Sequence, residues 1–421
     1  MNKKIRDIIF PKFSLYQPKK EHPNWKQLQI EAAHLALNVA KNMGTERRFF
    51  QTSLLQKRKI LAIIKTFKNL LKNKIKMAKG DHNFNPLFYI WTMTNNCNFK
   101  CSYCSDHRGG VYPDLFNKGF KKNLSTAQGM KLLKVMKEAS AIYFCGGEPT
   151  IRKDLPELLA YSTKLNMFNM INTNGSLIGD LLLNPRYRNF LRQMDVIIVS
   201  LDGLNISDLA KMYQSTESIA SKVIRNILAL RILQNFSRFK LVVNDVITPT
   251  SIDDSIDVLN WSNDLAITYS PVSANIDNQP DWNLLKNPHY ISLADLIIKR
   301  AQEGYPMIAS PRMLEKLLKF KGFTCYPKTF YHIDYTGDVF WPCKAYKNAA
   351  KINVLKYKKV KQVSKAGKNA IDASFFQGKG KNQCGGACAW MQDCVCDTYG
   401  KALREGIFDS GVLKEIQGLL N

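Results

Sequence analysis

The stretch that decides the fold of this chain is Cys97-Asn98-Phe99-Lys100-Cys101-Ser102-Tyr103-Cys104, where three cysteines follow the spacing C-x3-C-x2-C. Three thiolates on one short loop can hold three irons of a cubane cluster and leave the fourth iron open to a small molecule. A structural zinc site would need a fourth protein ligand close by, and none stands beside this loop. Three unrelated thiols are the alternative, but the spacing favours an iron–sulfur cluster.

Four β-rich apolar runs follow the cysteines, and each stops at small, polar or turn-forming residues. The runs are 141–145 before Gly146-Gly147-Glu148-Pro149, 168–171 before Asn172-Thr173-Asn174-Gly175, 195–199 before Ser200-Leu201-Asp202-Gly203, and 240–248, which contains Asn244. Such runs are typical of parallel strands that are buried on both faces. Helix-like stretches lie between them, at 126–139, 155–165, 181–194, 219–234 and 252–261. The alternation predicts repeated βα units, in which functional side chains gather at the carboxyl ends of the strands.

Together these motifs resemble the core of a radical S-adenosylmethionine (radical SAM) enzyme over about residues 86–300. The resemblance implies an α/β fold, a partial (β/α)6 TIM-like barrel. It matches the three cysteines, with the aromatic Tyr103 before the last of them, to the cluster loop of the family. It also matches the GGEP segment of the family to Gly146, Gly147, Glu148 and Pro149, and its polar strand-end residues, which contact SAM, to Ser200, Asp202 and Asn244.

The resemblance also implies a reaction. The amino and carboxylate groups of SAM bind the open iron of a [4Fe–4S] cluster held by Cys97, Cys101 and Cys104. One electron from the reduced cluster, supplied by a donor such as flavodoxin or ferredoxin, cleaves SAM to methionine and a 5′-deoxyadenosyl radical. The radical then abstracts a hydrogen atom from the substrate. The chain is therefore expected to be an enzyme of oxidoreductase or transferase type.

The GGEP residues fit a ligand-binding role, and they also have a structural explanation. Gly146 and Gly147 let the backbone approach a ligand closely, and their carbonyls could accept from an ammonium group near the anionic Glu148. The alternative is a tight strand-to-helix turn with a surface glutamate.

The polar residues at the other strand ends have similar alternatives. Ser200 and Asp202 can hydrogen-bond to ribose hydroxyls, or can cap a helix. Asn174 is a candidate SAM contact that is equally consistent with a turn, and Asn244 is equally consistent with a strand-edge amide. Cys145 ends an apolar run and is expected to be a small core residue.

The last quarter of the chain contains a second group of cysteines: Cys325, Cys343, Cys384, Cys388, Cys394 and Cys396. No secretory signal stands at the N-terminus, so metal binding is favoured over a disulfide framework. The group resembles the SPASM extension of radical SAM enzymes, with altered spacing, and implies one or two auxiliary iron–sulfur clusters. Two cubanes ligated only by cysteine need eight thiolates, so the candidates for a further ligand are Asp393, Asp397 and His332. A single zinc site made by the last four cysteines is the alternative.

The net charge is +27, and it is distributed unevenly. Residues 56–79 contain nine basic residues and no acidic one, with apolar residues at helical spacing. A basic amphipathic helix over residues 51–79 suits an anionic membrane surface, or packs its apolar stripe on the barrel with a solvated lysine face. A second lysine-rich stretch, 344–381, lacks arginine and any recognisable RNA-binding module, so nucleic acid is disfavoured as a partner. Residues 268–311 are expected to be a loop region between barrel and tail.

These features divide the chain into a basic helical extension (1–85), the barrel (86–300) and a Cys-rich tail (301–421). Three functions are consistent with them. The first is a radical SAM enzyme that modifies a peptide or protein side chain, and the second applies the same chemistry to a lipid or a lipid-linked or small metabolite. The third is a non-catalytic iron–sulfur or zinc scaffold, which the SAM-site motifs disfavour. The expected location is the cytoplasm, with the inner face of the membrane as a peripheral site.

Overall fold

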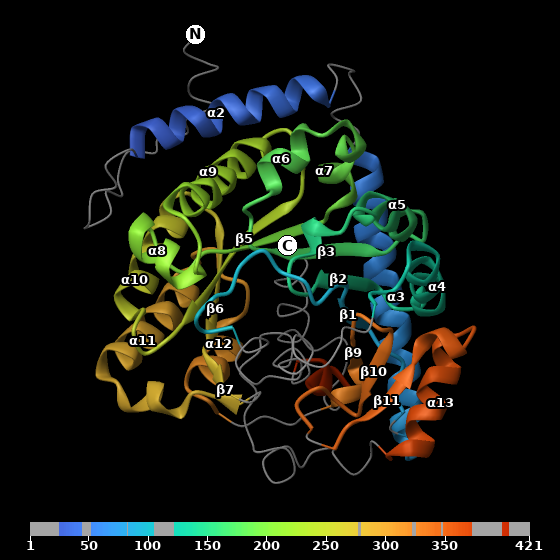
Figure 1. Ribbon diagram of the computed structural model, residues 1–421. Helices are drawn as coiled ribbons and strands as arrows, with labels where there is room; N and C mark the ends of the chain where they lie inside the picture. The colour runs from blue at the N-terminus through green and yellow to red at the C-terminus, as the bar shows by residue number, and fades with distance from the viewer. Residues whose placement is uncertain are drawn as a thin grey trace.

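The computed structural model describes residues 25–43, 52–81, 83–104, 122–276, 279–321, 326–346, 348–372 and 398–403. Its main sheet has the strand order β11-β10-β9-β1-β2-β3-β4-β5-β6 (Figure 1). Six neighbouring strands run parallel: β1 (Phe88–Thr92), β2 (Ala141–Cys145), β3 (Phe168–Thr173), β4 (Val196–Ser200), β5 (Lys240–Ile247) and β6 (Thr268–Ser273). This is the α/β barrel-like arrangement that the sequence predicted.

The sheet continues beyond β1 with strands from the C-terminal part of the chain. β9 (Phe330–Ile333) pairs parallel to β1, and β10 (Asp338–Trp341) and β11 (Ala350–Asn353) add antiparallel strands. The rings of Phe88 and Phe330 stack across the β1–β9 pair with their centroids 5.1 Å apart. A two-stranded hairpin of β7 (Asn275–Ile276) and β8 (Gln279–Pro280) follows β6. Strands from before and after residue 300 therefore belong to one sheet. The domain boundary that the sequence analysis placed at residue 300 stays a prediction.

Helices connect the parallel strands on the outside of the sheet (Figure 1). They are α4 (Thr126–Met136), α5 (Leu155–Lys164), α6 (Ile178–Leu183), α7 (Phe190–Gln193), α8 (Ile206–Tyr213), α9 (Glu217–Leu233) and α10 (Ile252–Asp264). Short 3-10 turns lie at η3 (Pro149–Ile151) and η4 (Pro185–Tyr187). After β6 come η5 (Trp282–Lys286), α11 (Pro288–Gln302), α12 (Pro311–Leu318), η6 (Pro327–Thr329), η7 (Val354–Lys356) and α13 (Val360–Ala370).

Two predicted segments differ from the structure. The single helix expected over 181–194 is broken into α6, η4 and α7, because Pro185 lacks the N–H that a continuous helix needs. The loop region expected over 268–311 contains β6 and α11 instead. Pro271 is accommodated in β6, which pairs with β5 on one side, so this proline does not break the strand.

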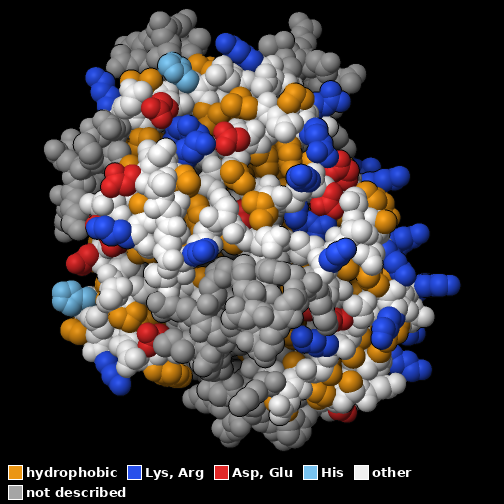
Figure 2. Space-filling view, viewed as in Figure 1, with side chains coloured by type: hydrophobic (Ala, Val, Ile, Leu, Met, Phe, Trp, Pro, Cys, Tyr) orange, Lys and Arg blue, Asp and Glu red, His pale blue; other side chains and the backbone are white. Residues whose placement is uncertain are grey.

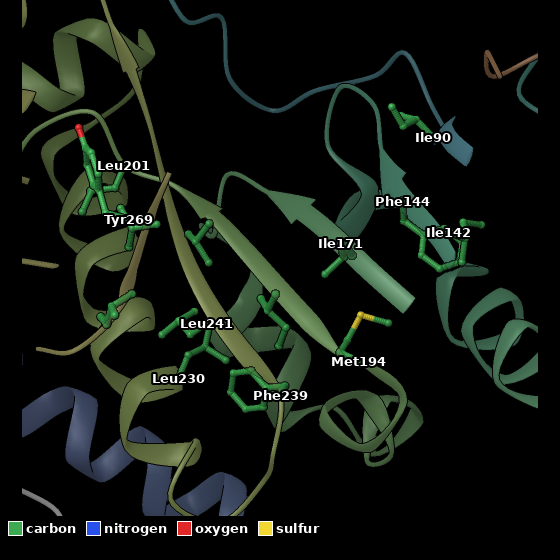
Figure 3. Packing of buried hydrophobic residues seen from close by; sticks show 14 of the residues in the cluster. Ile90, Ile142, Phe144, Ile171, Met194, Leu201, Leu230, Phe239, Leu241 and Tyr269 are labelled. Atoms are coloured by element: carbon green, nitrogen blue, oxygen red, sulfur yellow. The ribbon is translucent and has the colours of Figure 1, made fainter. Parts of the chain in front are cut away.

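The parallel strands are buried on both faces, as their apolar runs indicate. Ile171, Ile197 and Leu241 pack toward the helices in the main core, and Figure 3 shows Ile171 and Leu241 there. Alternate residues point into the barrel, where Phe168, Val196, Ile198 and Val242 form a second cluster. This alternation is the two-residue period of a strand.

Two helices precede the barrel. α2 (Trp25–Asn42) lies across α9 and α6 (Figure 1), and Trp25 packs edge-to-face on Trp261 of α10 at 6.0 Å. α3 (Thr52–Ala78) contributes Ala62 to the cluster inside the barrel. None of the helices in the described ranges is long and apolar enough to cross a membrane.

α3 closes the amino-terminal end of the barrel. Arg58 donates to residues just before β4, and Lys65 donates to carbonyls before β3 and before β2. Farther along the helix, Asn69 donates to the carbonyl of Glu138 before β2, and Asn73 donates to that of Asn85 before β1. Backbone carbonyls at the starts of four successive strands therefore receive hydrogen bonds from one helix.

Candidate functional site

The cysteine loop follows β1 and is fixed to the end of α8. Lys100 N–H donates to the carbonyl of Tyr213 at 3.2 Å, and Ser102 N–H donates to that of Met212 at 3.0 Å. The ring of Phe99 stacks on Tyr213 with centroids 4.8 Å apart. These contacts hold the three cysteines over the carboxyl ends of the strands, and all three are partly exposed.

The cysteines line a cavity of about 250 Å³ at this end of the barrel. Among the residues predicted from the sequence, Cys97, Cys101, Tyr103, Cys104, Gly146, Gly147, Asn174, Ser200 and Asn244 lie in its wall. The structure adds lining residues that were not predicted to contact a ligand: Phe99, Asn172, Thr173, Tyr213, Val246, Val272 and Asn275. Side chains from β3 to β7 therefore converge with the cysteine loop on one space.

The two glycines clamp the beginning of the cysteine loop. Gly147 N–H donates to the carbonyl of Thr94, and Glu148 N–H donates to that of Asn96, both at 2.8 Å. A Cβ on Gly147 would lie 2.1 Å from the Asn96 carbonyl oxygen, and one on Gly146, whose φ is +152°, would lie 2.4 Å from that of Thr94. Only glycine permits this approach of two backbones.

Glu148 lies behind the glycines and does not line the cavity. Its buried carboxylate accepts from Thr150 N–H at 2.9 Å, the Thr150 hydroxyl at 2.5 Å, the Thr173 hydroxyl at 2.7 Å and Asn174 N–H at 2.7 Å. Burial raises the pKa of this carboxyl group, and the hydrogen bonds oppose that rise. Pro149 is buried as the first residue of η3. These contacts tie the end of β2 to the end of β3, so Glu148 holds Asn174 in place.

Asp202 also lies beneath the cavity wall. Its carboxylate accepts from the Tyr103 hydroxyl at 2.5 Å and from Val246 N–H at 2.8 Å, and burial raises its pKa to about 6. The neighbouring Asp245 accepts from the Tyr269 hydroxyl at 2.6 Å, and burial and the charge of Asp202 raise its pKa to about 8. Asp202 therefore anchors the aromatic residue of the cysteine loop.

Two amide oxygens in the cavity wall have no hydrogen-bond partner among the residues that the structure describes. The Oδ1 atoms of Asn172 and Asn275 are buried and receive no hydrogen bond. A buried acceptor without a partner is costly, so this wall suits a ligand that carries N–H or O–H donors.

The donor set fits an iron–sulfur cluster, because three cysteines can each supply one thiolate to one iron. Burial raises the pKa values of the Cys97 and Cys101 thiols, so their thiolates need a cationic partner. In the described ranges no three Cys, His, Asp or Glu side chains converge on one ion position. A cubane takes one thiolate on each iron, so it does not require such convergence. The cysteines and the unpartnered amides together fit a [4Fe–4S] cluster with SAM beside it.

The expected auxiliary ligands fall mostly outside the described residues: Cys325, Cys384, Cys388, Asp393, Cys394, Cys396 and Asp397. Cys343 lies between β10 and β11, where its sulfur accepts from Ala345 N–H at 3.2 Å. His332 is a buried residue of β9 that packs against the ring of Phe330 at 5.1 Å. Ligation by these residues stays a prediction. Cys145 packs against the main core as expected, with its sulfur 3.8 Å from the Thr92 hydroxyl.

Comparison with known proteins agrees with this geometry. Residues 91–261 match the model of the Radical SAM superfamily. Fe-coproporphyrin III synthase of Methanosarcina barkeri is 38% identical over 27% of each chain. PqqA peptide cyclase of Xanthomonas euvesicatoria pv. vesicatoria is 27% identical over 30% of this chain and 32% of its own. The matches thus span a third or less of these two relatives.

One solved protein shares the fold over most of the chain. SuiB of Streptococcus suis, in a crystal structure with S-adenosylmethionine, has 16% sequence identity and a TM-score of 0.51, covering 68% of this chain and 67% of SuiB. SuiB bound to its precursor peptide SuiA gives a TM-score of 0.51 with 17% identity, covering 70% and 68%.

Proposed function

From the premise that this chain belongs to the radical SAM superfamily, we propose that it cleaves SAM reductively and modifies a peptide or protein side chain. The observation that carries the proposal is the convergence of Cys97, Cys101 and Cys104 with the glycine pair on one cavity at the carboxyl ends of the parallel strands. The cavity holds both kinds of group that this chemistry needs: thiolates for a cluster and polar backbone for a small ligand.

The residues of the cavity have separate proposed roles. Cys97, Cys101 and Cys104 would hold the cluster, and Gly146 and Gly147 would place their backbone beside the amino group of SAM. When bound, the cluster supplies one electron that cleaves SAM and gives the radical that abstracts a hydrogen atom. A flavodoxin or ferredoxin is the expected source of that electron.

The other wall residues would orient SAM and exclude water. The unpartnered oxygens of Asn172 and Asn275 can accept from amino or hydroxyl groups. Ser200 offers a hydroxyl, and the Asn244 amide is positioned by the Ser270 hydroxyl, which donates to its oxygen at 3.1 Å. Asp202 positions Tyr103 from behind, so in this proposal it is not a direct ribose ligand.

A peptide substrate is supported by two relatives. The name of PqqA peptide cyclase gives a peptide as its substrate, and SuiB has been crystallised with its precursor peptide. A lipid or lipid-linked substrate is the second candidate, because the exposed part of α3 is apolar and basic. A non-catalytic scaffold is disfavoured by a cavity whose wall leaves acceptors for a ligand.

The first experiment is anaerobic reconstitution of the wild-type chain and of the Cys97→Ala/Cys101→Ala/Cys104→Ala variant. Iron, sulfide and zinc are counted per chain, and 5′-deoxyadenosine is measured after reduction with dithionite. We expect the variant to lose about four irons and all 5′-deoxyadenosine formation. Equal iron in both proteins and no 5′-deoxyadenosine from the wild type would contradict the proposal.

The auxiliary clusters need a separate measurement. Cys384→Ala and Cys388→Ala should lower the iron content further while SAM cleavage without substrate continues. Loss of zinc in place of iron would support the alternative of a zinc site in the tail.

A further inference from the structure

α3 presents a row of aliphatic side chains on the face that points away from the barrel. Ile60, Ile64, Leu71 and Ile75 are 55%, 55%, 56% and 51% exposed. Their spacing of four, seven and four residues aligns them along one stripe of the helix. Single exposed aliphatic residues are ordinary on a protein surface, but an aligned row marks a surface that meets another partner.

The opposite face of α3 fixes this orientation through polar contacts. Arg58, Asn69 and Asn73 are buried there and donate to backbone carbonyls at the starts of the strands. Arg58 also pairs with the buried Asp195 at 3.2 Å. Rotating the helix to bury the aliphatic stripe would leave these polar groups without partners. The stripe is therefore a stable outer surface and not an unused core face.

Lysines surround the stripe. Lys57, Lys68, Lys72 and Lys79 of the α3 segment are exposed, and residues 51–79 contain no acidic side chain. α13 runs beside the end of α3, where Lys368 lies 3.8 Å from Asp81, and it exposes lysines at positions 361, 365 and 368. Figure 2 shows Lys and Arg side chains along the right-hand edge of the molecule, the side on which Figure 1 places α3 and α13.

We propose that the outer face of α3, with the lysines of α13 beside it, docks this protein on a bilayer that contains anionic lipid. The four aliphatic side chains would enter the boundary between headgroups and acyl chains, and the lysines would contact anionic headgroups. Lysine suits this position because its long apolar stem can lie along the stripe while its ammonium group stays in the headgroup layer.

This docking determines which way the cavity faces relative to the bilayer. α3 covers the amino-terminal ends of β1 to β4, whereas the cavity lies at their carboxyl-terminal ends. A protein that lies on the bilayer through α3 would turn the cavity away from the lipid. Substrate would then reach the cavity from the aqueous side. The docking goes beyond the proposed reaction and does not depend on SAM cleavage.

Flotation of the reconstituted full chain with lipid vesicles tests the proposal. The wild type should float with vesicles of phosphatidylcholine and phosphatidylglycerol, and much less with phosphatidylcholine alone. Ile64→Gln/Leu71→Gln should lower the partition coefficient roughly tenfold, and Lys68→Glu/Lys72→Glu at least as much. Glutamine is a good helix former, so the first variant should keep α3 folded.

Matched variants elsewhere serve as controls. Ile30→Gln/Leu37→Gln removes two exposed aliphatic side chains from α2, and Lys286→Glu/Lys299→Glu reverses two exposed charges near and on α11. Both should bind vesicles as the wild type does, and all variants should keep the wild-type unfolding midpoint. Wild-type protein that binds neither vesicle, or both equally, would overturn the proposal. Unchanged flotation of the α3 variants, or an equal loss of flotation in the controls, would also overturn the proposal. The aliphatic stripe would then be assigned to a protein partner.

Discussion

Asp195 and Asp202 lie at opposite ends of the same strand, β4, and both are fully buried. Asp195, at the amino-terminal end, meets the Arg58 guanidinium at 3.2 Å and accepts from Asn169 N–H at 2.8 Å. Asp202, at the carboxyl-terminal end, accepts from Tyr103 of the cysteine loop and from Val246 N–H. One aspartate closes the barrel, and the other supports the proposed site.

The wider surroundings of the two residues differ in the same way. At the amino-terminal end, α3 donates to the carbonyls that precede four strands. At the carboxyl-terminal end, Asn172 and Asn275 keep buried oxygens that no described residue contacts by a hydrogen bond, and three thiols face a cavity. The contrast teaches that one end is built for stability and the other for a ligand. Substitutions at the two ends should therefore separate loss of folding from loss of chemistry.

The largest expected effect is at the carboxyl-terminal end, in Cys101→Ala. Because this thiol lines the cavity and is one of three proposed cluster ligands, the variant should form no 5′-deoxyadenosine above background. Its metal-free form should unfold close to the wild-type denaturant midpoint. Cys145→Ala is the control, because Cys145 packs against the core outside the cavity wall, and it should keep its iron and most of its activity. Activity in Cys101→Ala would remove the contrast between the two ends.

Arg58→Met should give the largest loss of stability. It leaves the Asp195 carboxylate buried without its cation, which typically costs about 3–5 kcal/mol. Denaturant unfolding measures the change in the free energy of unfolding, and folded molecules should still form 5′-deoxyadenosine. Arg186→Met is the control: Arg186 pairs with Glu157 at 2.6 Å with both side chains exposed, so its loss should cost at most about 1 kcal/mol. Equal effects would mean that the buried pair does not close the barrel.

The sequence predicted the carboxyl-terminal end better than the amino-terminal end. Strand-end motifs are local, and parallel strands bring their ends together, so the convergence of Cys97, Gly146, Asn174 and Ser200 on one cavity followed from the pattern. The parallel direction of β2 to β5 followed in the same way, whereas β6 lies in a segment that was expected to be a loop. The sequence pattern did not predict whether a polar side chain points into the cavity or away from it. The burial of Glu148 was therefore seen only in the structure.

Other features depend on contacts between distant segments. Asn172 and Asn275 line the cavity, but neither was predicted to contact a ligand. Their oxygens lack a partner in the described part of the chain because of how the segments pack. In α3 the sequence shows apolar residues at helical spacing but not which stripe is buried. That choice is made by Arg58, Asn69 and Asn73 through carbonyls that lie far away in the sequence.

Gly147→Ala should have a smaller effect that still reaches the site. The added methyl group would lie 2.1 Å from the Asn96 carbonyl oxygen, and overpacking of this kind typically costs about 1–3 kcal/mol. The cysteine loop must move to relieve the contact, so iron retention should fall together with the free energy of unfolding. Gly203→Ala is the control, because its nearest neighbour, Asp254 Cβ, is 3.6 Å away. Retention of iron by Gly147→Ala would show that the loop is not held by the glycine pair.

Asp245→Asn tests the carboxyl-terminal end through pH, and its expected effect is a change of relative stability with pH and no loss of iron. Burial and the charge of Asp202 raise the pKa of Asp245 from 3.8 to about 8, so the folded chain holds this proton more tightly than the unfolded chain. The resulting stability is complete below about pH 4 and is lost as the pH rises through about 8. Asparagine has no proton to lose. The free energy of unfolding of the wild type, minus that of the variant, should therefore fall with rising pH by at most about 1.4 kcal/mol per unit.

Urea unfolding at several pH values in this range measures that difference, and Tyr269→Phe sharpens it. The Tyr269 hydroxyl donates to Asp245 and favours its charged form, so removing the hydroxyl should extend the fall to higher pH. A difference that stays flat with pH would mean that Asp245 is already ionised in the folded protein. Two adjacent buried carboxylates, Asp202 and Asp245, would then both be charged beneath the cavity. The carboxyl-terminal end would in that case have to contain a compensating cation, as Arg58 compensates Asp195 at the other end.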